Sequence, residues 1–234
     1  MTVVLATVCQ DGIVIGADSQ ITDKGRGMTY PAEKLHPLGE LAAWGGSGAR
    51  SVLFDVQRTF KEHSTAILEA PDIGRAMQEQ VLPILRHHYD TFISDVPGEE
   101  GGGTPAAYVM AAGWREGEPW IVEITPSGMI GHYGDIGFHA IGSGAAMAQQ
   151  AGSLLSHFRM GSRSLRFGCA AILRVLQALD MTSASVGQPF SLCRIDKDGA
   201  HHLSDKEIEQ VSKDVRRWQK AEQTAISDIF DQSE

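Results

Sequence analysis

The stretch TVVLATVCQDGIVIGADSQIT (residues 2–22) decides the fold class of this 234-residue chain. It holds two β-type apolar runs, at residues 3–9 and 13–18, separated by QDG. Asp-Gly between such runs is a strong signal for a β-hairpin, because glycine tolerates a positive φ in a tight turn. The first run begins almost at the chain end, although chain ends usually fray unless something holds them. We therefore expect the start of this chain to be built into a sheet.

Strand-type and helix-type patterns follow one another in groups along the rest of the chain. KLHPLGELAAWGG (34–46) predicts a second hairpin, and two helical patterns follow between residues 52 and 88, where Pro83 is expected to kink or end the second helix. Four strand-like segments between 106 and 144 precede two helices at 145–159 and 162–179, and a closing hairpin surrounds residues 198–199. Ser204 and Glu207 form a capping box for a last helix over about 204–231. Strands grouped between helix pairs predict an α+β fold, a four-layer αββα sandwich of two antiparallel sheets flanked by helix pairs.

Composition narrows the class of protein. With 42% hydrophobic residues and no long polar linker, residues 1–234 are expected to form a single domain. The formal net charge of −9 argues against a nucleic-acid surface, and no apolar run reaches the length of a membrane span. The three cysteines lack metal-type spacing and lie in apolar stretches, which favours buried thiols, a reducing cytoplasmic location and no metal.

Thr2 is a candidate nucleophile. Removal of Met1 by an aminopeptidase is expected before a residue this small, and it would leave a hydroxyl and a free α-amine on one residue. Such a threonine combines a nucleophile with its own base, since an α-amine has an ordinary pKa of about 7.7–8.0. Taken alone, Thr2 is better interpreted as an ordinary exposed end residue. If Met1 is retained, the amine is blocked and no such chemistry is expected.

Several short motifs, taken in order along nearly the whole chain, resemble those of proteasome β-type subunits in the N-terminal-nucleophile hydrolase family. They are GADSQIT (16–22), PAEKL (31–35), WGGSGARS (44–51), AIGSGAA (140–146) and LDMTS (179–183). The single residue before Thr2 resembles the simpler bacterial proteasome-like threonine peptidase, which depends on an unfoldase. The resemblance implies the N-terminal-nucleophile hydrolase fold and a threonine-type endopeptidase that needs no cofactor.

The resemblance also implies a set of catalytic residues. Thr2 would attack the peptide carbonyl, Lys34 would lower the pKa of the Thr2 amine and hydroxyl, and Asp18 would hold Lys34 charged. The backbone N–H of Gly48 would bind the oxyanion. The remaining residues would orient the amine and water: Ser143, Asp180 and Ser183. The family pattern Ser-Gly-Gly reads SASVG here, so the assignment of Ser183 is weaker than that of Asp180.

The same resemblance implies which residues contact the substrate. The backbone of Thr22 would pair with bound peptide, and Gly46 would leave the specificity pocket roomy. The other expected pocket residues are Ile21, Ala32, His36, Arg50 and Phe54. The partners implied are polypeptide substrates, further copies in a homo-oligomeric ring and an ATP-dependent unfoldase, without nucleic acid or membrane.

Two other functions stay open on the sequence: a catalytically silent structural ring subunit, and an amidohydrolase of the wider superfamily that acts on a small amide. Each proposed site residue also has an ordinary structural interpretation when taken singly. Asp18 is a typical turn former, Lys34 a typical edge-strand charge and Ser143 a typical N-cap.

Overall fold

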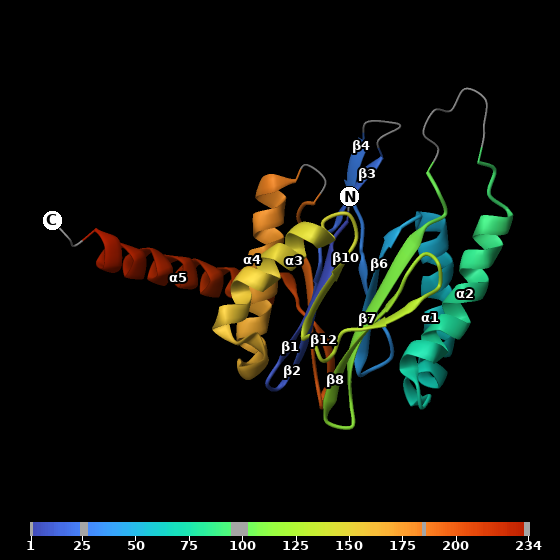
Figure 1. Cartoon of the computed structure of the whole chain (residues 1–234), viewed down its shortest axis with the longest axis horizontal. Coiled ribbons are helices and arrows are strands. Elements are labelled where there is room, and N and C mark those ends of the chain that lie inside the picture. The colour runs from blue at the N-terminus through green and yellow to red at the C-terminus, as the bar shows by residue number, and fades with distance from the viewer. Residues whose placement is uncertain (1, 24–27, 95–102, 184–185, 232–234) are drawn as a thin grey trace.

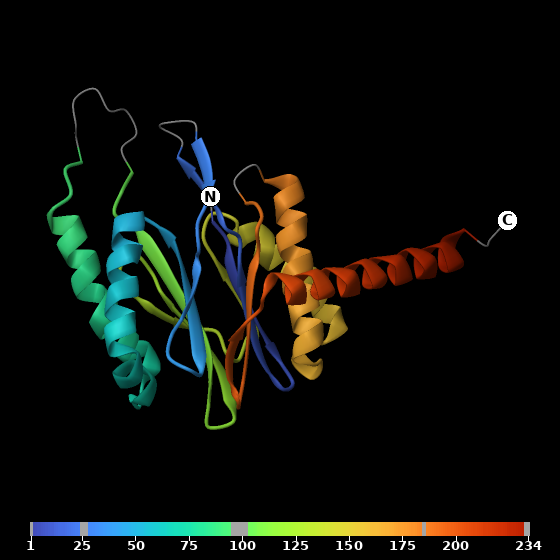
Figure 2. The ribbon, with the colours of Figure 1, turned by 180° about the vertical axis from the view of Figure 1, so that it is seen from behind.

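The computed structural model describes residues 2–23, 28–94, 103–183 and 186–231, without the side chains of Thr22 and Asp23. In this part of the chain, two five-stranded antiparallel sheets pack face to face, with helices on both outer sides (Figure 1). The same layers are seen from behind in Figure 2. The predicted four-layer αββα architecture is confirmed.

The first sheet holds the start of the chain in its interior. Its strands lie in the order β10-β1-β2-β11-β12, with bounds Phe138–Ile141, Val4–Cys9, Gly12–Ala17, Ser191–Asp196 and Gly199–His202. Val4 pairs with Ile141 on one side and with Ala17 on the other. The predicted first hairpin is therefore present, and both of its strands are buried within the sheet.

The second sheet carries the segment that faces the start of β1. Its strands lie in the order β5-β6-β7-β8-β9, with bounds Leu35–Pro37, Ala42–Gly48, Ala107–Arg115, Glu118–Ile124 and Ile130–His132. A separate two-stranded ladder joins β3 (Gln20–Asp23) to β4 (Met28–Pro31). Because β1 begins near the point where β6 ends, the loops after β2, β6 and β10 gather at one end of the sandwich (Figure 1).

Three apolar clusters hold the layers together. One lies between the sheets, one between the first sheet and helices α3 (Ala145–Leu155) and α4 (Leu165–Thr182), and one between the second sheet and helices α1 (Arg50–Glu69) and α2 (Ile73–Asp90). Each helix buries one stripe of apolar side chains, which is what the helical spacing in the sequence predicts. None of the described helices is long and apolar enough to cross a membrane.

Two helix predictions need correction. The helix expected over 145–159 ends at Leu155, and two short 3₁₀ turns follow at Ser156–Phe158 and Met160–Ser162. Arg159, between them, has a left-handed φ of 54°, which an α-helix does not accommodate. The α2 helix, in contrast, continues through Pro83 to Asp90, so Pro83 does not end it.

The last helix, α5 (Asp205–Phe230), is anchored by its first half and leaves the body of the fold with its second half (Figures 1 and 2). The Glu207 carboxylate accepts hydrogen bonds from the Ser204 amide and hydroxyl, as the capping box predicts. The Arg174 guanidinium on α4 donates to both carboxylate oxygens of Glu222 and lies 4.2 Å from the Trp218 ring centroid. Beyond Glu222, the large apolar side chains of the helix are exposed.

Candidate active site

Thr2 is surrounded by the turn that joins β10 to α3. The Thr2 nitrogen donates to Ser143 Oγ at 3.1 Å, and the Gly144 amide donates to the Thr2 carbonyl at 3.2 Å. Gly142 has a φ of +96°, and a Cβ at this position would lie 2.2 Å from the Thr2 oxygen. Glycine at 142 therefore lets the turn wrap tightly around Thr2. The preceding residue, Met1, lies outside the described residues.

Asp18 lies at the end of β2, directly beside the start of β1, and is fully buried. Its Oδ1 accepts from the Val3 amide at 2.9 Å and from Lys34 Nζ at 2.9 Å, while Oδ2 accepts from the Gln20 amide at 3.1 Å and also from Lys34 Nζ. A single carboxylate thus connects the residue after Thr2 with a lysine that is itself 7% exposed. Buried charges are expected only with this kind of pairing.

Lys34 is held in its ammonium form by three acceptor atoms. Two belong to Asp18, and the third is the Gln20 carbonyl at 2.5 Å. Burial lowers the pKa of Lys34 below its ordinary value of 10.5, and the charge and hydrogen bonding of Asp18 act in the opposite direction. The result is a positive charge fixed within two hydrogen bonds of the Val3 amide.

Gly48 ends β6 and precedes the first turn of α1. Its φ of +126° suits glycine, and a Cβ here would lie 2.1 Å from the Ala106 carbonyl. The hydroxyl of the neighbouring Ser47 lies 2.9 Å from the position of a Gly142 Cβ, on the same side as the Thr2 carbonyl. The end of β6 and the Thr2 turn therefore meet between the two sheets.

Asp180 and Ser183 lie further back, at the end of α4. Asp180 accepts a hydrogen bond from Gln188 Nε2 at 3.3 Å, and the Val186 amide donates to the Ser183 carbonyl at 3.3 Å. A Val186 methyl lies 3.6 Å from the position of a Gly144 Cβ. Val186 thus contacts both the end of α4 and the Thr2 turn. Ala184, where the sequence departs from the family pattern, is outside the described residues.

The expected peptide-binding strand is β3, which contains Ile21 and Thr22. Thr22 pairs with Thr29 across the β3–β4 ladder, and no strand of the described chain pairs with the other edge of β3. An unpaired strand edge is able to add an extended peptide as a further strand. Ala32 is half-buried and its amide donates to the Ser19 carbonyl at 2.7 Å, which ties the end of the ladder to Asp18.

The expected specificity pocket differs from the prediction at Gly46. A Cβ on Gly46 would lie 2.3 Å from a Leu53 methyl, so the Leu53 side chain occupies the space that the glycine was expected to leave open. His36 packs on the Trp44 ring, 5.0 Å between centroids, and its Nδ1 lies 3.1 Å from Gln57 Nε2. The His36 side chain is thereby directed toward α1.

The two remaining pocket residues are both exposed on the first turns of α1. Arg50 Nη1 donates to the Tyr30 hydroxyl at 3.4 Å, and the guanidinium lies 5.9 Å from the Tyr30 ring centroid. This contact connects the start of α1 to β4. Phe54 is 66% exposed and is free to contact a bound chain.

The described cysteines do not offer an alternative nucleophile. All three are buried free thiols, and burial raises the pKa of Cys9 and Cys193 to about 12 and that of Cys169 to about 11. Since the thiolate is the reactive form, these side chains are inert near neutral pH. Among the described residues, no group of three His, Cys, Asp or Glu side chains is placed to hold a metal ion.

Comparisons with known proteins identify the family of this chain. The model of the family described as "Proteasome subunit" matches residues 2–165. This chain belongs to the proteasome subunit family. It is 26% identical over 227 residues to the protein named proteasome subunit beta 1 of Streptomyces avermitilis, covering 92% of this chain and 76% of the relative.

Solved structures similar to this proteasome-family chain include Anbu from Hyphomicrobium sp. strain MC1. A mutant of that protein superposes with a TM-score of 0.71 at 19% identity, covering 98% of this chain and 99% of the other. Anbu in another crystal form gives a TM-score of 0.70 at 19% identity, covering 96% and 97%. At this identity the likeness establishes the fold.

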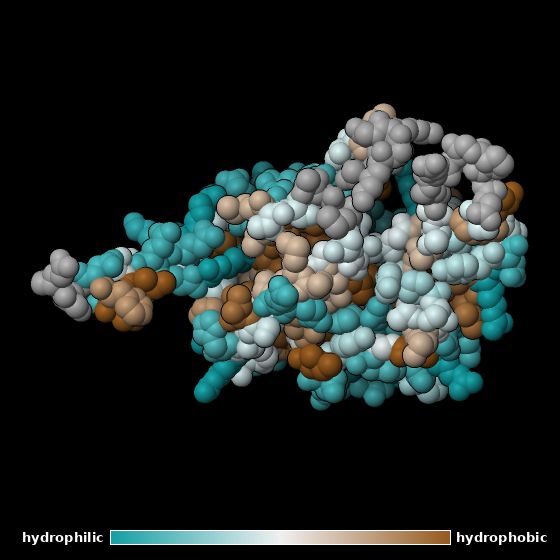
Figure 3. All heavy atoms as spheres, turned by 45° about the horizontal axis from the view of Figure 1, so that its top comes forward, coloured by the Kyte–Doolittle hydropathy of each residue, from teal (hydrophilic) through white to brown (hydrophobic). Residues whose placement is uncertain are grey.

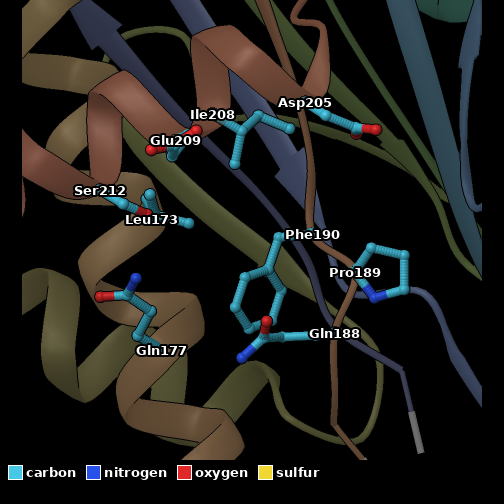
Figure 4. A pocket seen from close by; sticks show the side chains of 9 residues that line it. All are labelled: Leu173, Gln177, Gln188, Pro189, Phe190, Asp205, Ile208, Glu209 and Ser212. Carbon is cyan, nitrogen blue, oxygen red and sulfur yellow. The ribbon is translucent and has the colours of Figure 1, made fainter.

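A cleft of about 250 Å³ between α4 and the start of α5 lies apart from Thr2 (Figure 4). Phe190 forms its apolar floor, and the amides of Gln177 and Gln188 lie at its rim. It is lined by Leu173, Gln177, Gln188, Pro189, Phe190, Asp205, Ile208, Glu209 and Ser212. The Gln188–Asp180 hydrogen bond connects this cleft to one of the residues that the family resemblance assigns to the site.

Sequence reasoning missed several residues that shape this proteasome-family site. Gln20 supplies backbone contacts to both Asp18 and Lys34, and Gly142 and Gly144 enclose Thr2. The two glycines flank Ser143 in GSG, so the motif already held the signal for a turn with positive φ. Leu53 gave no comparable signal, because only the packing of α1 on β6 places it beside Gly46.

Proposed function

We propose that this chain is a threonine-type peptidase subunit of a proteasome-like ring, which hydrolyses peptide bonds through Thr2 once the residue before it has been removed. One observation carries the proposal: a buried Asp18 carboxylate binds both the amide next to Thr2 and the Lys34 ammonium. Membership in the proteasome subunit family supports the hydrolase class. A cytoplasmic site of action is part of the proposal and is supported by three unpaired thiols.

The first half of the proposed reaction forms a tetrahedral intermediate, which becomes an ester when the C–N bond breaks. The Thr2 Oγ proton passes to the free α-amine, directly or through a water, as Oγ bonds to the scissile carbonyl carbon. The three N–H donors of Lys34 are directed to Asp18 and Gln20. Lys34 therefore acts by its charge, which disfavours protonation of the nearby amine and lowers its pKa.

The second half releases both products. The Gly48 N–H stabilises the negative charge on the carbonyl oxygen, the C–N bond breaks, and the leaving amine takes the proton from the Thr2 ammonium. Water then attacks the ester, with the Thr2 amine again accepting a proton, and frees the carboxylic acid and Thr2. In this proposal Ser143 orients the Thr2 nitrogen, and their 3.1 Å contact supports that role.

Assembly into a homo-oligomeric ring that receives polypeptides from an ATP-dependent unfoldase completes the proposal. The outer half of α5 supports self-association, because Ile226, Ile229 and Phe230 are 57–72% exposed along one stretch of helix. Figure 3 shows an apolar patch near that end of the molecule. Exposed apolar patches of this kind commonly mark contacts between subunits.

Mass spectrometry and a covalent probe test the chemistry together. We expect intact-mass and N-terminal analysis to show Thr2 as the first residue, and a threonine-directed inhibitor to add its mass at Thr2. A chain that keeps Met1 and gains no adduct would support the silent structural subunit and overturn the enzymatic proposal. A Thr2 adduct on a chain that native mass spectrometry finds monomeric would instead favour the small-amide hydrolase.

A further inference from the structure

Glu123 on β8 and His139 on β10 form a buried acid–imidazole pair between the two sheets. Glu123 Oε2 lies 2.7 Å from His139 Nε2, and the two residues are 6% and 7% exposed. The pair has no part in the chemistry proposed for Thr2. Replacing a buried pair with apolar side chains of similar size is often neutral or stabilising, so stability alone does not account for it.

Tyr133 completes a small polar cluster around this pair. Its ring stacks on His139 with centroids 3.5 Å apart and planes 6° from parallel. Burial, the charge of Glu123 and a hydrogen bond to Glu123 raise the pKa of Tyr133 above its ordinary value. Gln149 of α3 approaches the other ring nitrogen, with Nε2 3.5 Å from His139 Nδ1. The imidazole is thereby fixed on both edges and on one face.

The cluster matters for the site because β10 is an edge strand. It pairs only with β1, through Ala6↔His139 and Val4↔Ile141, and has no strand on its other side among the described residues. The Glu123–His139 contact supplies a second anchor, to the opposite sheet. Immediately after β10 comes the turn of Gly142 and Ser143 that surrounds Thr2.

We propose that Glu123, His139 and Tyr133 form a clasp, which holds β10 in place so that Ser143 Oγ meets the Thr2 nitrogen. This inference rests on the proposed function, and its three members are positioning residues for that reaction. The pairing with β1 sets the register of β10, and the 2.7 Å contact adds one direction and one distance toward the opposite sheet, which an apolar contact does not specify. The clasp thus acts through the strand on the turn that orients the nucleophile.

The test compares Glu123→Leu, which removes the acceptor, with Glu123→Gln, which keeps the shape and one hydrogen-bonding oxygen. On a fluorogenic peptide amide, we expect Glu123→Leu to lower kcat by about tenfold to a hundredfold, the cost of a misplacement near 1 Å, with KM within about twofold. Glu123→Gln should recover most of the lost kcat. Glu222→Gln, which weakens the α4–α5 ion pair, is the matched control and should leave kcat unchanged.

Amide hydrogen exchange gives a readout that does not need peptidase activity. Glu123→Leu should speed exchange in the peptide covering residues 138–146, and the control should not. A folded Glu123→Leu with unchanged kcat, or one whose KM alone rises, would overturn the clasp. Unaltered exchange over 138–146 would overturn it too, even if kcat falls. If the parent protein hydrolyses nothing, the proposed function fails, and the exchange experiment still decides whether the clasp holds the strand.

Discussion

The two ends of the described chain are held in opposite ways. The first residues lie inside the molecule, where Thr2 and Val3 are bound by Ser143, Gly144 and Asp18. The last helix is anchored by the buried Val211 and Val215 and by the ion pairs Arg166–Asp214 and Arg174–Glu222, and then runs away from the body (Figure 1). A terminus fixed by buried polar contacts is suited to chemistry, whereas a protruding apolar helix is suited to contact with another molecule.

The largest difference between the two ends is expected when a threonine at each end is replaced by alanine. Thr2→Ala removes the proposed nucleophile and should reduce peptide hydrolysis at least about a thousandfold. The free energy of unfolding should change by less than about 1 kcal/mol, because only one half-buried hydroxyl and methyl are lost. Thr224→Ala on α5 is the matched control and should retain full activity. Hydrolysis by a verified Thr2→Ala protein would remove Thr2 from the mechanism.

Breaking one ion pair at each end is expected to have the next largest effect. Lys34→Met leaves Asp18 as a buried, uncompensated charge, which costs about 3–5 kcal/mol of stability, and it also removes the cation beside the amine. Arg174→Met breaks a half-exposed pair and should cost about 1 kcal/mol or less. Urea unfolding measures both values, and a peptide assay follows kcat.

The Lys34 result is separated from misfolding by adding Asp18→Asn. The double variant no longer contains a buried charge, so it should recover part of the stability that Lys34→Met loses, yet it should remain inactive. Recovery of activity along with stability would show that Lys34 has a structural role only.

The apolar tip of α5 should affect assembly rather than the site. Replacing Ile226, Ile229 and Phe230 together by serine removes the exposed apolar patch and should shift native mass spectra toward smaller species. Leu154→Ser, on the 75% exposed Leu154 of α3, controls for loss of surface apolarity in general. An unchanged assembly in the α5 variant would show that the protruding helix is not a subunit contact.

Local sequence patterns predicted most of the fold and the part of the candidate site that surrounds the start of β1. The β1–β2 hairpin followed from Asp-Gly between apolar runs, and Asp18, Lys34 and Ser143 followed from motifs in the order of a known family. In the structure these three side chains lie together at the start of β1, through contacts with Thr2, Val3 and one another. The features that the sequence did not predict depend mostly on packing between distant segments. Leu53 fills the space beside Gly46, and the Glu123–His139 pair joins residues from separate sheets. A local departure is the helix expected over 145–159, which ends at Leu155 and is followed by 3₁₀ turns on either side of the left-handed Arg159.

Acid titration is expected to have the smallest effect, and it distinguishes the strands of the body from the last helix. Burial lowers the pKa of His36 on β5 and of His202 on β12, which both belong to the body of the fold. Histidines with lowered pKa values stabilise the fold fully above their unfolded pKa of about 6.5, and this stability is lost as pH falls toward the folded values. On α5, hydrogen bonds with Arg174 and Arg166 lower the pKa of Glu222 and Asp214, and the Ser204 cap lowers that of Glu207 to about 2.

Carboxylates with lowered pKa values keep their contribution to stability until the pH falls below about 4. As the pH is lowered, the strands β5 and β12 should therefore loosen before α5 does. Hydrogen exchange, corrected for intrinsic rates, should show β5 and β12 loosening between about pH 6.5 and 5 while the anchored half of α5 stays protected. His202→Gln should flatten the first change and leave the second. If α5 loosened at a higher pH than β5, the expectation that α5 resists acid better than the strands would be wrong.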